Sequence, residues 1–126
     1  MSIPVTLETL RTELERFGAT PYLLTVADDG RPHSVAVNVV WTEEGLTAGC
    51  GRRTLANLTA RPLVCLLWPP FEPGGYSLIV DGDAAVSGAG EEARVIIRPT
   101  KGVMHRPAAK PVTGGDDCGH DCVKVS

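Results

Sequence analysis

The sequence predicts a mainly β fold in which about six short strands form a closed or half-closed antiparallel barrel, with two short helices. Three observations support this fold class. Short apolar segments recur along the chain, turn sequences separate them at regular spacing, and most connections are short enough for hairpins. The 126 residues suit one domain, and the hydrophobic and charged fractions of 43% and 21% are typical of globular proteins.

The N-terminal segment predicts a short helix over residues 7–17. Thr6 can cap its first turn, and Gly18 stands where a glycine commonly ends a helix. The helix should pack against the barrel core, because its apolar residues share one helical face: Leu7, Leu10, Leu14 and Phe17.

A hairpin should follow this helix. Residues 22–26 have the composition of a strand, and Asp28-Asp29-Gly30 is a turn sequence. The return strand is expected over residues 33–41, where Val35, Val37 and Val39 alternate with Ser34, Ala36, Asn38 and Val40. A further short strand is expected over residues 46–49.

The second half of the chain begins with a short helix at residues 52–60, which Pro62 ends. Residues 63–68 are continuously apolar and predict a strand buried on both faces. Two more strands are expected over residues 76–86, with a break near 81–83, and over residues 93–98. We therefore expect a barrel domain over residues 1–98 and an irregular tail, rich in Pro, Gly and Asp, over residues 99–126.

Composition argues against several functional classes. The formal net charge of −3 and the pI near 5.5 disfavour a nucleic-acid-binding protein, which normally carries a basic excess. No apolar stretch approaches the ~18 residues of a membrane helix. Met1 is not followed by the basic and apolar regions of a secretory signal, so a cytoplasmic protein with reduced cysteines is expected.

Residues 51–58 are the most informative stretch for function. Arg52 and Arg53 stand at the start of the second predicted helix, where free backbone N–H groups and the helix dipole also favour an anion. An arginine guanidinium group can donate two parallel hydrogen bonds to two phosphate oxygens, so this segment is a candidate phosphate site. The alternative is that both arginines are solvated surface charges and that Thr54 only caps the helix.

Three segments together resemble the pyridoxamine 5′-phosphate oxidase-like family of split-barrel flavoproteins: residues 30–37, residues 51–58 and residues 61–68. The resemblance covers roughly residues 5–98 and depends on the order and spacing of the segments. It implies a six-stranded antiparallel split barrel with a short N-terminal helix and a short helix between middle strands. It further implies a homodimer that holds FMN, or a deazaflavin relative, at the subunit interface.

The resemblance also implies which residues would contact the cofactor. The ring contacts would include Val35, Val37, Asn38 and Val40, and the phosphate contacts would be made by Arg52, Arg53, Thr54 and Asn57. Many members have a lysine three residues before the asparagine, whereas this sequence has Thr54 there. A pyridoxamine-phosphate site like that of the true oxidase is not evident in this shorter chain.

Three functions remain open at this point. The first is an FMN- or deazaflavin-dependent oxidoreductase acting on a small-molecule substrate; such a protein needs no nucleophile of its own, because the flavin transfers the hydride. The second is a non-catalytic binding protein for a flavin, haem or a similar planar cofactor. The third is a structural dimer that has lost its cofactor, which Thr54 makes credible.

The C-terminal segment holds a cluster of potential metal ligands. Cys118, His120 and Cys122 are residue types that bind zinc, but only one such knuckle is present. The alternatives are a tail with free thiols, a disulfide or a metal clip.

Overall fold

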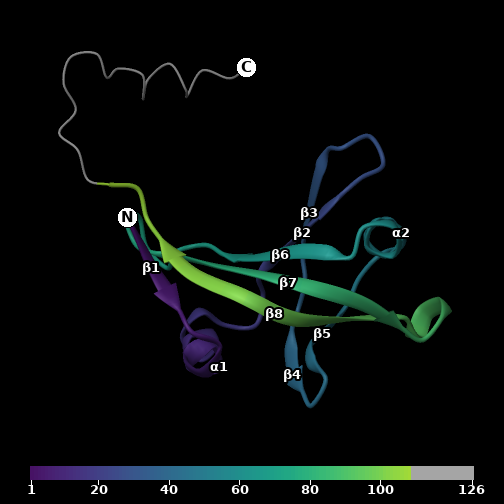
Figure 1. Ribbon diagram of the computed structural model, residues 1–126, viewed down its shortest axis with the longest axis horizontal. Helices are drawn as coiled ribbons and strands as arrows, with labels where there is room; N and C mark the ends of the chain where they lie inside the picture. Colours follow the sequence, from purple (N-terminus) through teal and green to yellow (C-terminus); the bar gives the residue numbers. More distant parts are fainter. Residues whose placement is uncertain (109–126) are drawn as a thin grey trace.

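A long antiparallel hairpin, β7–β8, runs through the middle of the fold (Figure 1). The structure is a computed structural model, and it describes residues 1–108 of the chain. Eight strands and two α-helices make up this part, together with a single 3-10 turn, η1. Their bounds are β1 Ser2–Val5, α1 Leu7–Phe17, β2 Tyr22–Val26, β3 Pro32–Ala36, β4 Val40–Thr42, β5 Gly45–Gly49, α2 Arg52–Ala60, β6 Leu63–Trp68, β7 Ser77–Ser87, η1 Gly90–Glu92 and β8 Arg94–His105.

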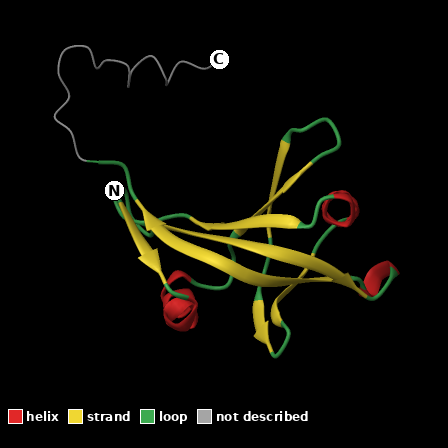
Figure 2. Cartoon of the chain, in the orientation of Figure 1, coloured by secondary structure: helices red, strands yellow, loops and turns green. Residues whose placement is uncertain are grey.

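The strands form one antiparallel sheet in the order β3-β2-β6-β7-β8-β5-β4, and β1 pairs with the C-terminal half of β8. The sheet is open, which is consistent with a split barrel (Figure 2). The two α-helices lie far from each other, at opposite ends of the sheet (Figure 2). Within residues 1–108, no helix has the length and apolar content needed to cross a membrane.

The core lies on the inner face of the sheet and is closed by both helices. Leu23, Leu66, Val80 and Ile97 are fully buried there, one from each of four strands. Helix α1 contributes two leucines and helix α2 contributes one: Leu10, Leu14 and Leu58. Burial of such side chains is the main stabilising term of a domain of this size.

Helix α1 spans residues 7–17, as predicted from the sequence. The Thr6 side chain accepts a hydrogen bond from the Thr9 N–H (3.2 Å), and Gly18 ends the helix at φ +95°, which favours glycine. The predicted apolar face is only partly buried, because Leu7 at its first turn stays 54% exposed.

The strand predicted over residues 33–41 is two strands, β3 and β4. Between them, the Val37 and Val39 N–H groups donate to the carbonyls of Pro21 and Ala19, which precede β2 (3.0 and 2.8 Å). These two bonds continue the register in which Tyr22 pairs with Ala36, but Pro21 has no N–H to return a bond, so the regular ladder ends at Ala36. The predicted alternation persists, with Val37 and Val39 buried. This division and the unpredicted β1 explain why the structure has eight strands rather than six.

Strand β6 corrects a second prediction, because it is not buried on both faces. Val64, Leu66 and Trp68 point into the core, whereas Leu63 is 69% exposed. The opposite face of β6, which also carries Cys65, lies outside the core.

Strand β8 extends seven residues beyond the predicted barrel boundary at Arg98, to His105. Pro99 is accommodated at a bulge, where the register with β7 shifts between Asp81 and Gly82. A side chain at Gly82 would place its Cβ 2.8 Å from the Arg98 carbonyl oxygen, so the close approach of the two strands requires glycine. Strand β7, predicted to break here, is continuous through the bulge.

Candidate functional site

A solvent-open hollow of about 980 Å³ separates the first turns of α2 from the turn that joins β2 to β3. One side is formed by Arg52, Arg53, Ala56 and Asn57, and the other by Ala27, Asp28 and Asp29. The candidate phosphate segment therefore faces an acidic turn that the sequence predicted only as a hairpin connection. The hollow is the natural place to test the predicted cofactor contacts.

The N-terminus of α2 borders this hollow through Arg52 and Arg53, and its first turn has no side-chain cap. Gly51 is the N-cap and has no side chain that could accept from the first turn, and the first intrahelical bond runs from the Leu55 N–H to the Gly51 carbonyl (3.0 Å). Arg52 and Arg53 are both exposed, and neither forms an ion pair within residues 1–108. Two free guanidinium groups beside three unpaired N–H groups suit the phosphate of a ligand.

Thr54 and Asn57, the other two predicted phosphate contacts, lie in the interior of the monomer. Their exposed fractions are 2% and 5%. The Asn57 Nδ2 donates a hydrogen bond to the Thr25 Oγ1 of β2 (3.0 Å), and Thr25 is itself buried. The amide of Asn57 thus anchors α2 to the sheet, and Thr54 stands one turn before it on the same buried side.

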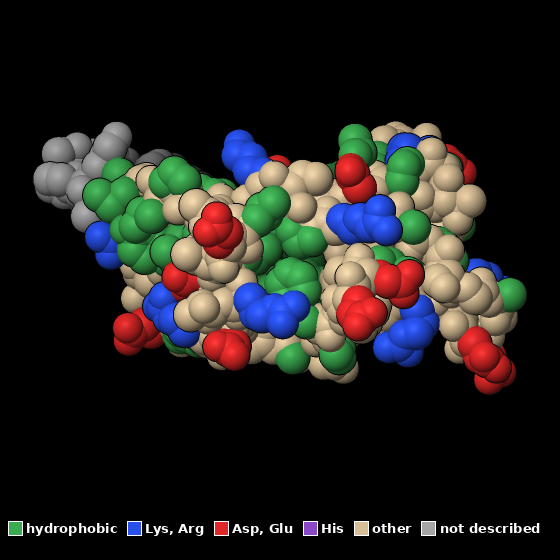
Figure 3. Space-filling view, turned by 60° about the horizontal axis from the view of Figure 1, so that its bottom comes forward, with side chains coloured by type: hydrophobic (Ala, Val, Ile, Leu, Met, Phe, Trp, Pro, Cys, Tyr) green, Lys and Arg blue, Asp and Glu red, His purple; other side chains and the backbone are tan. Residues whose placement is uncertain are grey.

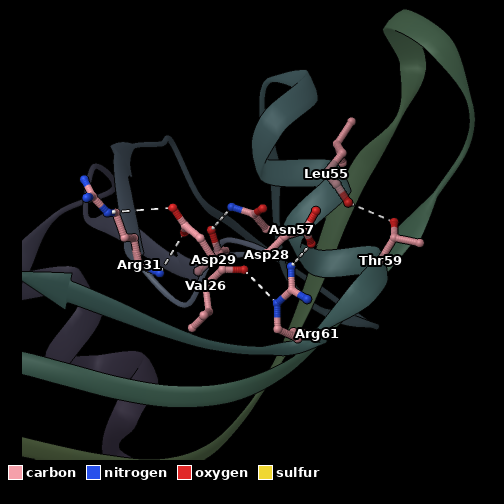
Figure 4. Close-up of polar contacts among 9 residues, drawn as sticks. Val26, Asp28, Asp29, Arg31, Leu55, Asn57, Thr59 and Arg61 are labelled. Carbon is pink, nitrogen blue, oxygen red and sulfur yellow. Dashed lines mark hydrogen bonds and ion pairs between the residues drawn. The ribbon is translucent and has the colours of Figure 1, made fainter.

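The acidic turn is tied to arginines that the sequence analysis did not select. Arg61, just past α2, donates to the Val26 carbonyl through Nε (2.9 Å) and to the Asp28 carboxylate through Nη2 (2.7 Å), as Figure 4 shows. Asp29 lies 3.7 Å from the Arg31 guanidinium, an exposed pair within the turn itself. The sequence shows Asp28, Asp29 and Arg61 as charged residues, but it does not indicate that Arg61 pairs with Asp28, more than 30 residues earlier.

Two of the four predicted ring contacts belong to the core, and the other two are exposed on the surface. Val35 is half-buried and Val37 is buried, so both belong to the core. Asn38 and Val40 are exposed, and the Asn38 Oδ1 accepts a hydrogen bond from the Thr20 hydroxyl (2.9 Å). Only the second pair presents side chains on the outside of the monomer.

An apolar surface lies on the outer face of β2 and β6. Tyr22 and Leu67 are paired across the two strands, as are Leu24 and Cys65, and the exposed Val26 and Leu63 continue the surface. A groove of about 430 Å³ runs along this face. Such exposed apolar surfaces commonly mark interaction sites.

A different face of the molecule has a mixed charge pattern (Figure 3). Lys and Arg side chains alternate there with Asp and Glu, and apolar side chains gather toward one end. The chain as a whole carries a formal net charge of −3, so the adjacent Arg52 and Arg53 stand in an acidic protein.

The two cysteines of the described region are poor nucleophiles. Burial raises the pKa of Cys50, and burial together with the neighbouring Asp81 carboxylate raises the pKa of Cys65 to about 11. Both thiols therefore stay protonated near neutral pH. Residues 1–108 contain no cluster of metal-ligating side chains, and the candidate ligands Cys118, His120 and Cys122 lie outside the described residues.

Comparison with known proteins places the chain among relatives. No family model matches the sequence. An uncharacterised protein of Mycobacterium bovis is 44% identical over 119 residues, which cover 83% of this chain and 84% of that protein, and a protein of Mycobacterium tuberculosis matches equally well. This chain belongs to one family with these mycobacterial proteins.

Solved structures identify the fold of this family member. A pyridoxamine 5′-phosphate oxidase-like protein of Listeria innocua has a TM-score of 0.62 at 18% identity, over 77% of this chain and 96% of that one. The fold is thus the pyridoxamine 5′-phosphate oxidase-like split barrel, as the sequence resemblance implied.

Two other split barrels bind planar cofactors. The haem storage protein HutZ of Vibrio cholerae has a TM-score of 0.61 at 19% identity and matches 79% of this chain and 94% of its own. An FAD-binding protein of Mycobacterium smegmatis has a TM-score of 0.59 at 19% identity and matches 84% and 100%. Solved proteins of this fold accordingly include one that stores haem and one that binds FAD.

Proposed function

We propose that this split-barrel protein is an FMN- or deazaflavin-dependent oxidoreductase that acts on a small-molecule substrate. The observation that carries the proposal is the pairing of two exposed arginines, free of ion pairs within the described chain, with the uncapped N-terminus of α2 at one hollow. Arg52, Arg53 and the first-turn N–H groups would hold the cofactor phosphate there. A bound flavin supplies hydride transfer, so catalysis requires no nucleophile from the chain itself.

The remaining predicted contacts take different parts in this proposal. Asn38 and Val40 would face the ring system, since both are exposed in or beside the segment between β3 and β4. Val35 and Val37 would fix the position of that segment by packing against the core. Thr54 and Asn57 would hold α2 in place from its buried side. We infer that the buried pair contributes to the position of the phosphate site rather than to its hydrogen bonds.

A homodimer belongs to the same proposal. The outer face of β2 and β6 leaves Tyr22, Val26 and Leu63 exposed by 44%, 40% and 69%. A second copy would cover this apolar surface through a two-fold interface, and the cofactor would lie between the subunits. The protein would work in the cytoplasm, where its thiols stay reduced.

A non-catalytic binding protein for haem or another planar cofactor is the second candidate. Its support is the similarity to HutZ, together with the buried Thr54 at the place where the family resemblance implies a lysine. The visible spectrum of the purified protein separates the candidates, because bound oxidised flavin and bound haem absorb at different wavelengths.

The decisive experiment is a titration of wild type and the double variant Arg52→Ala/Arg53→Ala with FMN and with riboflavin. Each charge-assisted hydrogen bond to a phosphate contributes ~1.5–3 kcal/mol, so losing two weakens FMN binding by about two to four orders of magnitude. Riboflavin lacks the phosphate, and its weaker binding should barely change.

The double variant Arg11→Ala/Arg16→Ala removes the same charge from α1, far from the hollow, and serves as the control (Figure 1). It should retain wild-type affinity for FMN. Equal FMN affinity in wild type and the Arg52/Arg53 variant would show that this turn is only a solvated helix end.

A further inference from the structure

Arg61 joins the two walls of the hollow through a single side chain. It is the C-cap residue of α2, and its own N–H donates to the Asn57 carbonyl (2.8 Å). From there its guanidinium reaches the end of β2, at the Val26 carbonyl (2.9 Å), and the turn beyond it, at the Asp28 carboxylate (2.7 Å), as Figure 4 shows. The planar fork of arginine allows both contacts at once.

The partner of Arg61 is unfavourable to an anionic ligand when it stands alone. Asp28 lines the same hollow as Arg52 and Arg53, and its side chain is 94% exposed. Without Arg61, the Asp28 carboxylate would repel a phosphate in the hollow. It would also attract the guanidinium groups of Arg52 and Arg53, which would otherwise bind that phosphate. The contact at 2.7 Å both neutralises Asp28 and fixes it toward the far end of α2.

We propose that Arg61 is a positioning residue of the phosphate site: it withdraws and neutralises Asp28, and so leaves Arg52 and Arg53 available to the phosphate. This inference rests on the proposed function, and it adds Arg61 to the same site as a residue that acts through Asp28. The Arg31–Asp29 pair differs, because its two charged groups are 3.7 Å apart and it lies within the turn and does not reach α2.

The attachment of α2 to the sheet does not depend on Arg61 alone. The buried Asn57–Thr25 hydrogen bond and the buried side chain of Leu58 also hold the helix. Loss of the Arg61 side chain should therefore leave the fold intact and affect mainly the charge facing the hollow. This separation makes the inference testable by binding.

The test is a double-mutant cycle with Arg61→Ala and Asp28→Asn, read by titration with FMN and with riboflavin at low ionic strength. We expect Arg61→Ala to weaken FMN binding by about two- to fivefold, the range for an exposed charge pair, and to leave riboflavin binding unchanged. In the Asp28→Asn background the same substitution should have less than about twofold effect, because the repelling carboxylate is gone. Added salt should reduce the loss.

A conservative variant and a control complete the design. Arg61→Lys keeps the charge and should retain FMN affinity within about twofold of wild type. Arg61→Gln removes the charge but keeps a long polar side chain, and it replaces Arg61→Ala in the cycle if the alanine variant does not fold. Arg16→Ala breaks a comparable exposed ion pair on α1, Arg16–Glu13 at 2.6 Å, and should change neither affinity.

Several outcomes would overturn the inference. Equal losses of FMN and riboflavin affinity in Arg61→Ala would mean that Arg61 is only structural. A loss of the same size with and without Asp28 would mean that Arg61 acts on the phosphate directly. A loss in Arg61→Lys beyond about twofold would exclude charge neutralisation. Wild-type protein that binds neither flavin would instead overturn the FMN form of the proposed function, and with it this inference about the FMN phosphate.

Discussion

Side chains on one short helix have different roles here because they differ in burial. Arg53 and Asn57 both line the hollow, yet Arg53 is exposed and Asn57 is 5% exposed with its amide committed to Thr25. A buried polar group needs its partner, so the Asn57 amide is not free to take up a ligand without cost. Exposure, rather than residue type, therefore separates the candidate phosphate ligands from their supports.

Cys65 allows a pH-dependent test at the residue scale. Burial, and then Asp81, raise the pKa of its thiol from 9.0 to about 11. The folded protein thus keeps a proton that the unfolded chain releases above pH 9, so this thiol favours the fold below pH 9 and loses that contribution as pH rises toward 11.

We expect the alkylation of Cys65 by iodoacetamide to stay slow up to about pH 10 in the folded protein and to accelerate one to two pH units earlier in urea, since the thiolate is the nucleophile. Peptide mass spectrometry distinguishes Cys65 from the other cysteines. Asp81→Asn should move the folded profile toward lower pH, because it removes the repelling charge and leaves the burial. Coincident profiles in buffer and urea would contradict this prediction.

At the scale of elements, β8 holds the fold together. Its first four residues pair with β5, its last four pair with β1, and it pairs with β7 along its length. The second half lies entirely beyond the domain boundary at Arg98 that the sequence predicted. Its backbone hydrogen bonds make it part of the sheet.

Two truncations test this role. A chain that ends after Pro99 loses the strand partner of β1 and of half of β7, so we expect it to be unfolded or to melt more than about 10 °C lower, at ~4–8 °C per kcal/mol. A chain that ends after Ala108 retains every helix and strand of the described structure and should melt within a few degrees of the full chain. Thermal unfolding followed by circular dichroism measures both, and equal midpoints for the two truncations would contradict the importance of β8.

At the scale of the whole molecule, one sheet face remains without a partner within the described chain. The inner face of β2 and β6 is packed under the helices, whereas the outer face exposes Tyr22, Val26 and Leu63. Because contiguous exposed apolar surface is unfavourable in water, association of two copies is the simplest way to cover it.

We expect light scattering to give about twice the chain mass of 13.3 kDa at micromolar concentration. Leu63→Glu should shift the protein toward the monomer with little change in its own fold, because Leu63 is 69% exposed and makes little core contact. The matched change Leu7→Glu, at an exposed leucine on α1, should leave the mass unchanged. A monomeric wild type at high micromolar concentration would contradict the dimer.

Local features of the sequence determined the helices and most strand positions. The bounds 7–17 and 52–60 are confirmed because helix ends depend on nearby residues: Thr6 and Gly18 cap the first helix, and Pro62 limits the second. Strand 22–26 is confirmed, and the alternation of Val35 and Val37 indicated which side faces the core. The sequence also indicated Arg52 and Arg53 as exposed residues at a helix start.

Tertiary contacts decided the rest. The split between β3 and β4 depends on carbonyls before β2, and the length of β8 depends on its pairing with β1 at the other end of the chain. The inward position of Asn57 and the tie between Arg61 and Asp28 depend on the packing of α2 against β2, more than 30 residues away. Propensity, capping and periodicity act over a few residues, whereas these features arise from partners that only the folded chain brings together.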